Sequence, residues 1–270
     1  MSKRQRFLMA TLVIFAGIIL SRLGLGQFIQ WRFRVIIFFI TSLCVSIWAI
    51  RDEDFNGVEW LTLPILPTTF SLCGLLVFPL IPLSFGEGDS GLLLGTAFRI
   101  LFLALIIVGY YASLLTSNIY NVAAVRTIQL LRVAHSIGFL VTIATALFGF
   151  LVIGSLHLSS LLNFLLVFIL CLPLMFQAIW SISLESKVGE STRNYSLICA
   201  IILAQIAWVL SFWPVGSSIL ALFLTAIFYE LIGIVQFHLG EKLNSKIVRE
   251  FVLVAIIIFF LTFFTTQWGA

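Results

Sequence analysis

This sequence consists mostly of long apolar stretches. Polar and apolar residues do not alternate within them. Two examples are FLMATLVIFAGIIL (residues 7–20) and FVLVAIIIFFLTFF (residues 251–264). Lipid offers no partners for backbone hydrogen bonds, so only helices and closed barrels cross a bilayer, and barrel strands alternate apolar and polar residues. Only 10% of the 270 residues are charged, against about 25% in soluble domains. The sequence therefore predicts an all-α, polytopic transmembrane helix bundle.

Nine apolar stretches approach the roughly 20 residues that a helix needs to cross the hydrocarbon core. The connections between them are short, which predicts a single transmembrane domain over residues 1–270. The predicted spans are residues 7–25, 34–50, 60–84, 95–116, 130–154, 158–181, 195–213, 216–237 and 250–267.

The span at residues 60–84 is the least regular, because it contains Pro64, Pro67, Pro79 and Pro82. A proline inside a helix removes a backbone hydrogen bond and kinks the helix. We expect a short or bent helix here, with breaks near Pro67 and Pro79. The alternative is a re-entrant segment that lines a cavity, as in transporters, which would leave eight complete spans.

The distribution of basic residues predicts the orientation, because Lys and Arg stay on the cytoplasmic side of a membrane. A cytoplasmic N-terminus places most of them inside. The basic start MSKRQR precedes an apolar run, as in a signal peptide, but no cleavage site of small residues follows. We expect an uncleaved first span.

No signature of an enzyme is present: HExxH, GxSxG and the phosphate-binding GxxxxGK[ST] are all missing from the sequence. The four cysteines and three histidines do not have the spacing of metal ligands. We therefore expect no catalytic residue, metal or cofactor, and an enzyme is disfavoured. The expected partners are the lipid bilayer and a membrane protein, and not nucleic acid. The oligomeric state is left open.

One acidic residue, Glu230, lies within the apolar stretch FYELIGIVQF (residues 228–237). A charged residue near the bilayer centre costs about 2.5–3.5 kcal/mol on insertion scales, so Glu230 is expected to face protein or a cavity. At about 100° per residue, Ala226, Gly233 and Phe237 lie on the same helix face. Small residues on that face allow close contact between helices.

The first candidate partner of Glu230 is His135 and the second is Arg132, because both begin the span 130–154 at a similar depth. Two roles for this buried polar cluster remain open: a proton or cation site, or a polar contact that only holds helices together. Further polar candidates for the cluster are His238, Gln177 and Gln205.

Arg99 interrupts the apolar stretch GLLLGTAFRILFLAL (residues 91–105). It is a candidate contact for an anion or a lipid headgroup. Its long side chain could equally extend to the outer headgroups and have no specific ligand.

Six segments of the chain carry a resemblance to a known family: residues 57–67, 114–140, 173–182, 210–239, 249–260 and 264–269. They resemble uncharacterised polytopic membrane proteins from candidate-phylum bacteria, catalogued as a domain of unknown function. The resemblance implies a bacterial cytoplasmic (inner) membrane and a similar topology, but no activity or site.

Two functional hypotheses follow. The first is a non-enzymatic membrane component that binds envelope proteins or lipids, favoured by the lack of catalytic motifs. The second is a small proton- or cation-coupled transporter or lipid-handling protein with Glu230 as its buried ionisable site. The proline-rich span and the buried acid favour the second.

Overall fold

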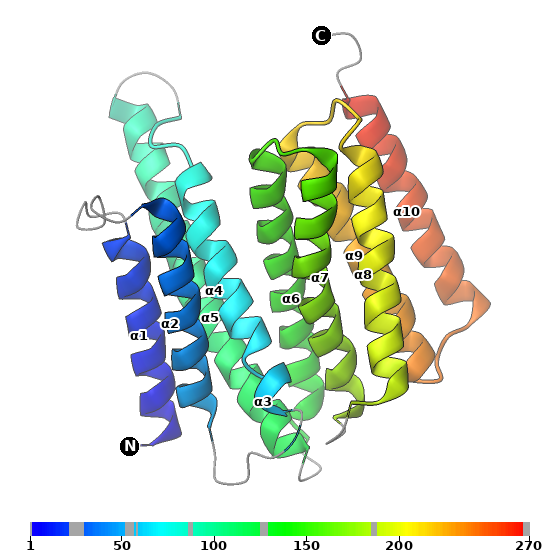
Figure 1. Cartoon of the computed structure of the whole chain (residues 1–270), viewed down its shortest axis with the longest axis horizontal. Coiled ribbons are helices and arrows are strands. Elements are labelled where there is room, and N and C mark those ends of the chain that lie inside the picture. Colours follow the sequence, from blue (N-terminus) through cyan, green and yellow to red (C-terminus); the bar gives the residue numbers. More distant parts are fainter. Residues whose placement is uncertain are drawn as a thin grey trace. The chain divides into compact units, whose positions relative to one another are not determined.

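The computed structural model describes residues 2–21, 30–51, 57, 59–85, 89–124, 129–184 and 188–266, and every regular element in these ranges is a helix. The predicted all-α class is therefore confirmed. The elements are α1 (Lys3–Leu20), α2 (Trp31–Ile50), α3 (Glu59–Thr62), α4 (Ile65–Val77), the 3-10 helix η1 (Phe78–Leu80), α5 (Asp89–Ala123), α6 (Leu131–Ser155), α7 (Ser160–Ser183), α8 (Glu190–Leu210), α9 (Ser217–Leu239) and α10 (Ser245–Thr265) (Figure 1).

Eight helical stretches in the described part of the chain are long and apolar enough to cross a membrane. They are α2, the segment Glu59–Leu80 that contains α3, α4 and η1, and the helices α5 to α10. They correspond to the second to ninth predicted spans. The first predicted span, residues 7–25, overlaps α1, whose 18 residues include Lys3, Arg4 and Arg6; residues 22–25 of that span lie outside the described residues. The chain is a multi-pass membrane protein.

The chain forms two compact units, residues 1–141 (unit 1) and residues 142–270 (unit 2). Helix α6 begins in unit 1 and ends in unit 2. The single domain expected over the whole chain stays a prediction.

In unit 1, buried hydroxyl groups join the helices that pack together. Helix α2 packs against α1, α4 and α5. The Ser42 hydroxyl of α2 shares a hydrogen bond of 2.6 Å with Ser71 of α4. The Ser46 hydroxyl, also on α2, shares one of 3.0 Å with Tyr110 of α5. Such bonds between helices help to hold a bundle together in lipid.

The proline-rich span is broken at two places. Helix α3 ends at Thr62, and α4 begins at Ile65 after a turn. At the other end α4 passes into η1, which contains Pro79. The expected short, broken helix is confirmed, and so is the break near Pro79.

The first break lies at residues 63–64 and not at Pro67, so that detail of the expectation is wrong. Pro67 lies in the first turn of α4, where backbone N–H groups have no partner within the helix and proline is tolerated. The carbonyl of Leu63 instead accepts a hydrogen bond of 2.9 Å from the Ser117 hydroxyl of α5. A side chain from another helix thus satisfies a backbone group at the break.

The segment after η1, residues 81–85, lies directly against α5. The Phe85 amide donates a hydrogen bond of 3.1 Å to the Gly91 carbonyl. One turn further along α5, a Cβ atom added at Gly95 would lie 2.1 Å from the Leu83 carbonyl oxygen. Only glycine allows the two backbones to approach this closely.

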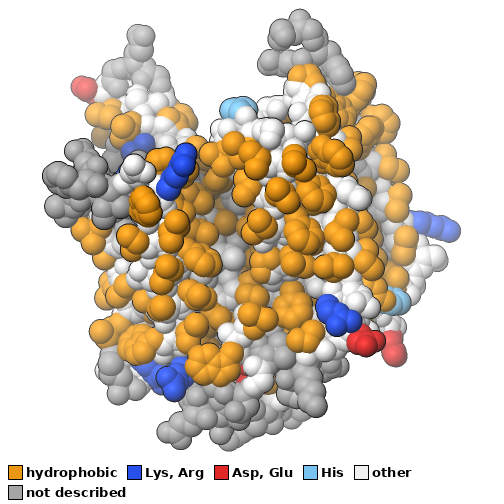
Figure 2. All heavy atoms as spheres, in the orientation of Figure 1, with side chains coloured by type: hydrophobic (Ala, Val, Ile, Leu, Met, Phe, Trp, Pro, Cys, Tyr) orange, Lys and Arg blue, Asp and Glu red, His pale blue; other side chains and the backbone are white. Residues whose placement is uncertain are grey.

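Unit 2 contains the end of α6 and the helices α7 to α10. Helix α7 packs against α8 and α9, and α9 packs against α8 and α10. From α6, the ring of Phe150 contacts Phe228 of α9 edge-on, with centroids 6.2 Å apart. On the face drawn in Figure 2, hydrophobic side chains cover the helices and charged side chains lie near their ends, as expected for helices that cross a bilayer.

Candidate functional site

Glu230 is buried on α9 in unit 2, with 7% of its surface exposed, which confirms the burial predicted from the sequence. Two residues predicted to share its face, Gly233 and Phe237, both pack against Phe251 of α10. A Cβ atom at Gly233 would lie 2.6 Å from the Phe251 ring, and the rings of Phe237 and Phe251 are 6.1 Å apart. Tyr229, the residue before Glu230, also contacts the Phe251 ring at 5.9 Å. This side of α9 is therefore closed by α10.

The carboxyl group of Glu230 lacks hydrogen-bond partners among the described residues. Its Oε1 atom is fully buried and accepts no hydrogen bond. The same is true of Oε1 of Gln177 on α7, a residue that is only 2% exposed. Buried polar atoms are nearly always hydrogen-bonded, so these two oxygens are exceptions, as is Oδ1 of Asn163, which also lies in unit 2 without a partner.

Gln177 and Glu230 lie in the same half of their helices. Helices α7 and α9 run in the same direction and are packed together (Figure 1). At a rise of 1.5 Å per residue along the helix axis, Gln177 lies about 9 Å from the C-terminal end of α7. Glu230 lies about 14 Å from the C-terminal end of α9.

Within the described part of unit 2, no other charged residue lies as far from the nearest helix end as Glu230. Neither α7 nor the end of α6 contains a charged residue. Those of α8 and α10 lie in the first two turns of these helices and are exposed: Glu190, Arg193, Lys246, Arg249 and Glu250. The described part of unit 2 therefore has no basic residue at a helix position as deep as that of Glu230.

The two predicted partners of Glu230 belong to unit 1. The His135 ring packs against the Tyr120 ring, with centroids 5.4 Å apart. Arg132 is exposed at the start of α6. Since Glu230 belongs to unit 2, its contacts with these residues stay predictions.

The remaining polar candidates lie on the surface of unit 2. His238 is exposed near the end of α9, and its ring meets the Tyr195 ring of α8 edge-on at 5.7 Å. Gln205 is exposed on α8 and makes no hydrogen bond to a described residue.

Arg99 has a structural role that the sequence did not reveal. Its Nη2 and Nε atoms donate hydrogen bonds of 2.6 and 3.2 Å to the carbonyl of Ile81. Its guanidinium group lies 5.7 Å from the centre of the Phe78 ring. Arg99 thereby fixes the segment that follows η1 to α5. Its contact with an anion or a lipid headgroup stays a prediction.

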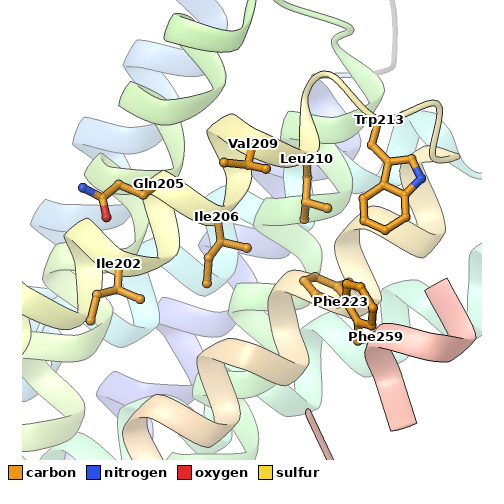
Figure 3. Close-up of a pocket in the computed structure, with 8 residues that line it drawn as sticks. All are labelled: Ile202, Gln205, Ile206, Val209, Leu210, Trp213, Phe223 and Phe259. Atoms are coloured by element: carbon orange, nitrogen blue, oxygen red, sulfur yellow. The ribbon is translucent and has the colours of Figure 1, made fainter. Parts of the chain in front are cut away.

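An open groove of about 320 Å³ lies in unit 2, and no motif in the sequence predicts it. It lies between α8, α9 and α10, with Trp213 at one end (Figure 3). Glu230 is not part of its wall. The lining residues are Ile202, Gln205, Ile206, Val209, Leu210, Trp213, Phe223 and Phe259.

Metal binding by clustered side chains finds no support in the described part of the chain, which contains no group of three or more His, Cys, Asp or Glu residues. Of the cysteines, Cys73, Cys171 and Cys199 are buried and unpaired with one another. Glu230 and Gln177 are therefore the two buried candidate residues whose Oε1 atoms have no hydrogen-bond partner among the described residues.

The family relationship covers both units. A family model described as a protein of unknown function (DUF5656) matches residues 18–265. The chain belongs to the DUF5656 family. The DUF5656 match extends from the last turns of α1 to the end of α10, and so includes all eight membrane-spanning stretches. No curated protein and no solved structure matches the chain. The expected membership of a family of unknown function is confirmed, and the bacterial source of that family stays a prediction.

Proposed function

We propose that this chain is a non-enzymatic membrane protein in which Glu230 binds a proton or a cation, as in a small proton- or cation-coupled transporter. The observation that carries the proposal is the buried Oε1 atom of Glu230, which has no hydrogen-bond partner. An ionised carboxylate in apolar surroundings is strongly unfavourable unless it is paired. It therefore requires a proton or a bound cation.

Gln177 favours the same class of ligand. Carboxylate and amide oxygens are ligands of hard cations, and the unpartnered oxygens of Glu230 and Gln177 are of these two kinds. The two helices that carry them pack together. Ionisable residues inside membrane spans commonly mark ion pathways and proton relays.

The proposal is tested by measuring the unfolding temperature of the purified chain in detergent. Sodium, potassium, magnesium and calcium chlorides are added separately at constant ionic strength, and pH is varied in a second series. A ligand at about 100 times its Kd stabilises the folded state by about 2.7 kcal/mol. We expect one of these responses to be larger in the wild type than in Glu230→Gln, which keeps the shape of the side chain but cannot ionise; the pH response of the other titratable groups remains in both.

Glu241→Gln is the matched control, because Glu241 is exposed in the turn after α9; it should retain the wild-type response. Identical responses in the wild type and Glu230→Gln would refute the proposal and leave Glu230 as a polar contact between helices.

A second candidate function is the binding of lipids or of another membrane protein. The open groove between α8, α9 and α10 favours it. This function and the one based on Glu230 use different residues.

For the location, we propose a bacterial cytoplasmic membrane with the N-terminus in the cytoplasm. The N-terminus is placed in the cytoplasm because this puts most Lys and Arg residues on the cytoplasmic side. The bacterial membrane is what the family resemblance implies. Cysteine labelling in intact cells with a membrane-impermeant reagent tests the orientation, in a background where the exposed Cys44 is replaced by alanine. We expect labelling of Gln30→Cys and His157→Cys but not of Ser2→Cys or Glu241→Cys. Labelling of Ser2→Cys would contradict the orientation.

A further inference from the structure

Helix α8 presents a continuous exposed stripe to its surroundings. Its members follow one another in alternating steps of four and three residues: Ile198, Ile202, Gln205, Val209 and Phe212, the last in the turn that follows the helix. We call them the α8 stripe. The four apolar members are 51%, 37%, 67% and 75% exposed, in this order. Steps of four and three residues are the spacing with which two helices pack along a common seam.

The central member of the α8 stripe is the polar residue Gln205. It is flanked by apolar residues in the sequence ILAQIAWVL (residues 202–210) and is exposed. With Ile202 and Val209, Gln205 also lines the open groove, and Figure 3 shows its side chain directed away from the aromatic groove residues. An amide that faces hydrocarbon without a hydrogen-bond partner is unfavourable. Gln205 therefore needs a partner group at its own depth in the membrane.

We propose that a second copy of this chain packs against the α8 stripe, and that the two Gln205 side chains hydrogen-bond to each other across a two-fold axis. Two copies inserted in the same direction bring equivalent residues of α8 to the same depth. An amide both donates and accepts hydrogen bonds, so Gln205 is complementary to itself, as an isologous interface requires. The hydrocarbon chain of a lipid offers no hydrogen-bond partner to the Gln205 amide.

The position of Gln205 also fits a role in defining the dimer. A single polar residue in an otherwise apolar seam specifies the register and number of packed helices, and Gln side chains hydrogen-bond between helices in membranes. The dimer does not depend on the proposed function of Glu230, because it uses a different helix and an exposed surface.

Symmetric disulfide formation tests the geometry of the dimer. Val209→Cys, in a full-length chain with Cys44 replaced by alanine, should form a crosslinked dimer on oxidation in native membranes. Leu222→Cys is the control, because Leu222 is 57% exposed on α9 and outside the α8 stripe; it should remain monomeric. Crosslinking at Leu222→Cys but not at Val209→Cys would overturn the proposal.

The role of Gln205 is tested by measuring dimerisation in liposomes as the ratio of protein to lipid is varied, with subunit counting by single-molecule photobleaching. We expect Gln205→Leu to weaken dimerisation about three- to tenfold, the effect of one or two hydrogen bonds between membrane helices. Gln205→Asn should retain most of it. All variants should keep the wild-type unfolding temperature under conditions where the chain is monomeric, because the side chain is exposed. A monomeric wild type, or a dimer insensitive to Gln205→Leu, would refute the proposal.

Discussion

Replacement of Gly95 by leucine is expected to prevent unit 1 from folding, and Gly95→Ala is expected to fold with reduced stability. A Cβ atom at Gly95 would lie 2.1 Å from the oxygen and 2.4 Å from the carbon of the Leu83 carbonyl. These are backbone atoms, held in place by the hydrogen bonds between residues 81–85 and α5. Extra methylene groups in a well-packed region typically cost about 1–3 kcal/mol. Leucine adds a whole side chain against fixed backbone atoms, so we expect its cost to exceed the total stability of the fold, which is about 5–15 kcal/mol for a typical protein.

Thermal unfolding of the purified variants in detergent, followed by circular dichroism, measures this effect. Ala97→Leu is the matched control: it adds a large side chain to the same helix two residues away, at an exposed position. It should unfold at the wild-type temperature. If Gly95→Leu behaved like Ala97→Leu, residues 81–85 would not lie against α5.

Much of the fold could be predicted from the sequence because membrane spans are long and their composition is distinctive. The second to ninth predicted spans each correspond to a helical stretch, and the proline-rich span is broken. The position of its first break could not be predicted, because prolines are tolerated in a first helical turn. The break at residues 63–64 instead relies on a hydrogen bond from Ser117, which is far away in the sequence.

The candidate site was predictable only in part, for a similar reason. The unfavourable transfer of a carboxylate into lipid predicted that Glu230 is buried. This transfer free energy does not predict which groups surround Glu230, since its neighbours depend on how the helices pack. Arg99 shows the same limit: the sequence indicated an unusual charge in an apolar span, but its partner is a backbone carbonyl of the broken span. The open groove is formed by α8, α9 and α10 together, and no sequence motif indicates it.

Replacement of Glu230 by leucine is expected to raise the stability of the folded chain by about 1–3 kcal/mol, the cost of burying a polar group without a hydrogen bond. The two side chains are similar in size, and leucine removes the orphaned Oε1 atom. Replacing a buried polar group by an apolar one of similar shape is often neutral or stabilising. The measurement is the free energy of unfolding at neutral pH, in a buffer that contains only a large organic cation.

Thr225→Val is the matched control for this substitution, because it removes a buried oxygen from the same helix that already has a partner. The Thr225 hydroxyl donates a hydrogen bond of 2.6 Å to the Ala221 carbonyl, so its removal should bring no gain. A destabilised Glu230→Leu would mean that the carboxyl group holds helices together. A more stable Glu230→Leu variant that has also lost its response to protons and cations would mean that the carboxyl group does not hold the helices together. The chain then retains at this position a residue that weakens its fold, and ligand binding is the physical reason to keep it.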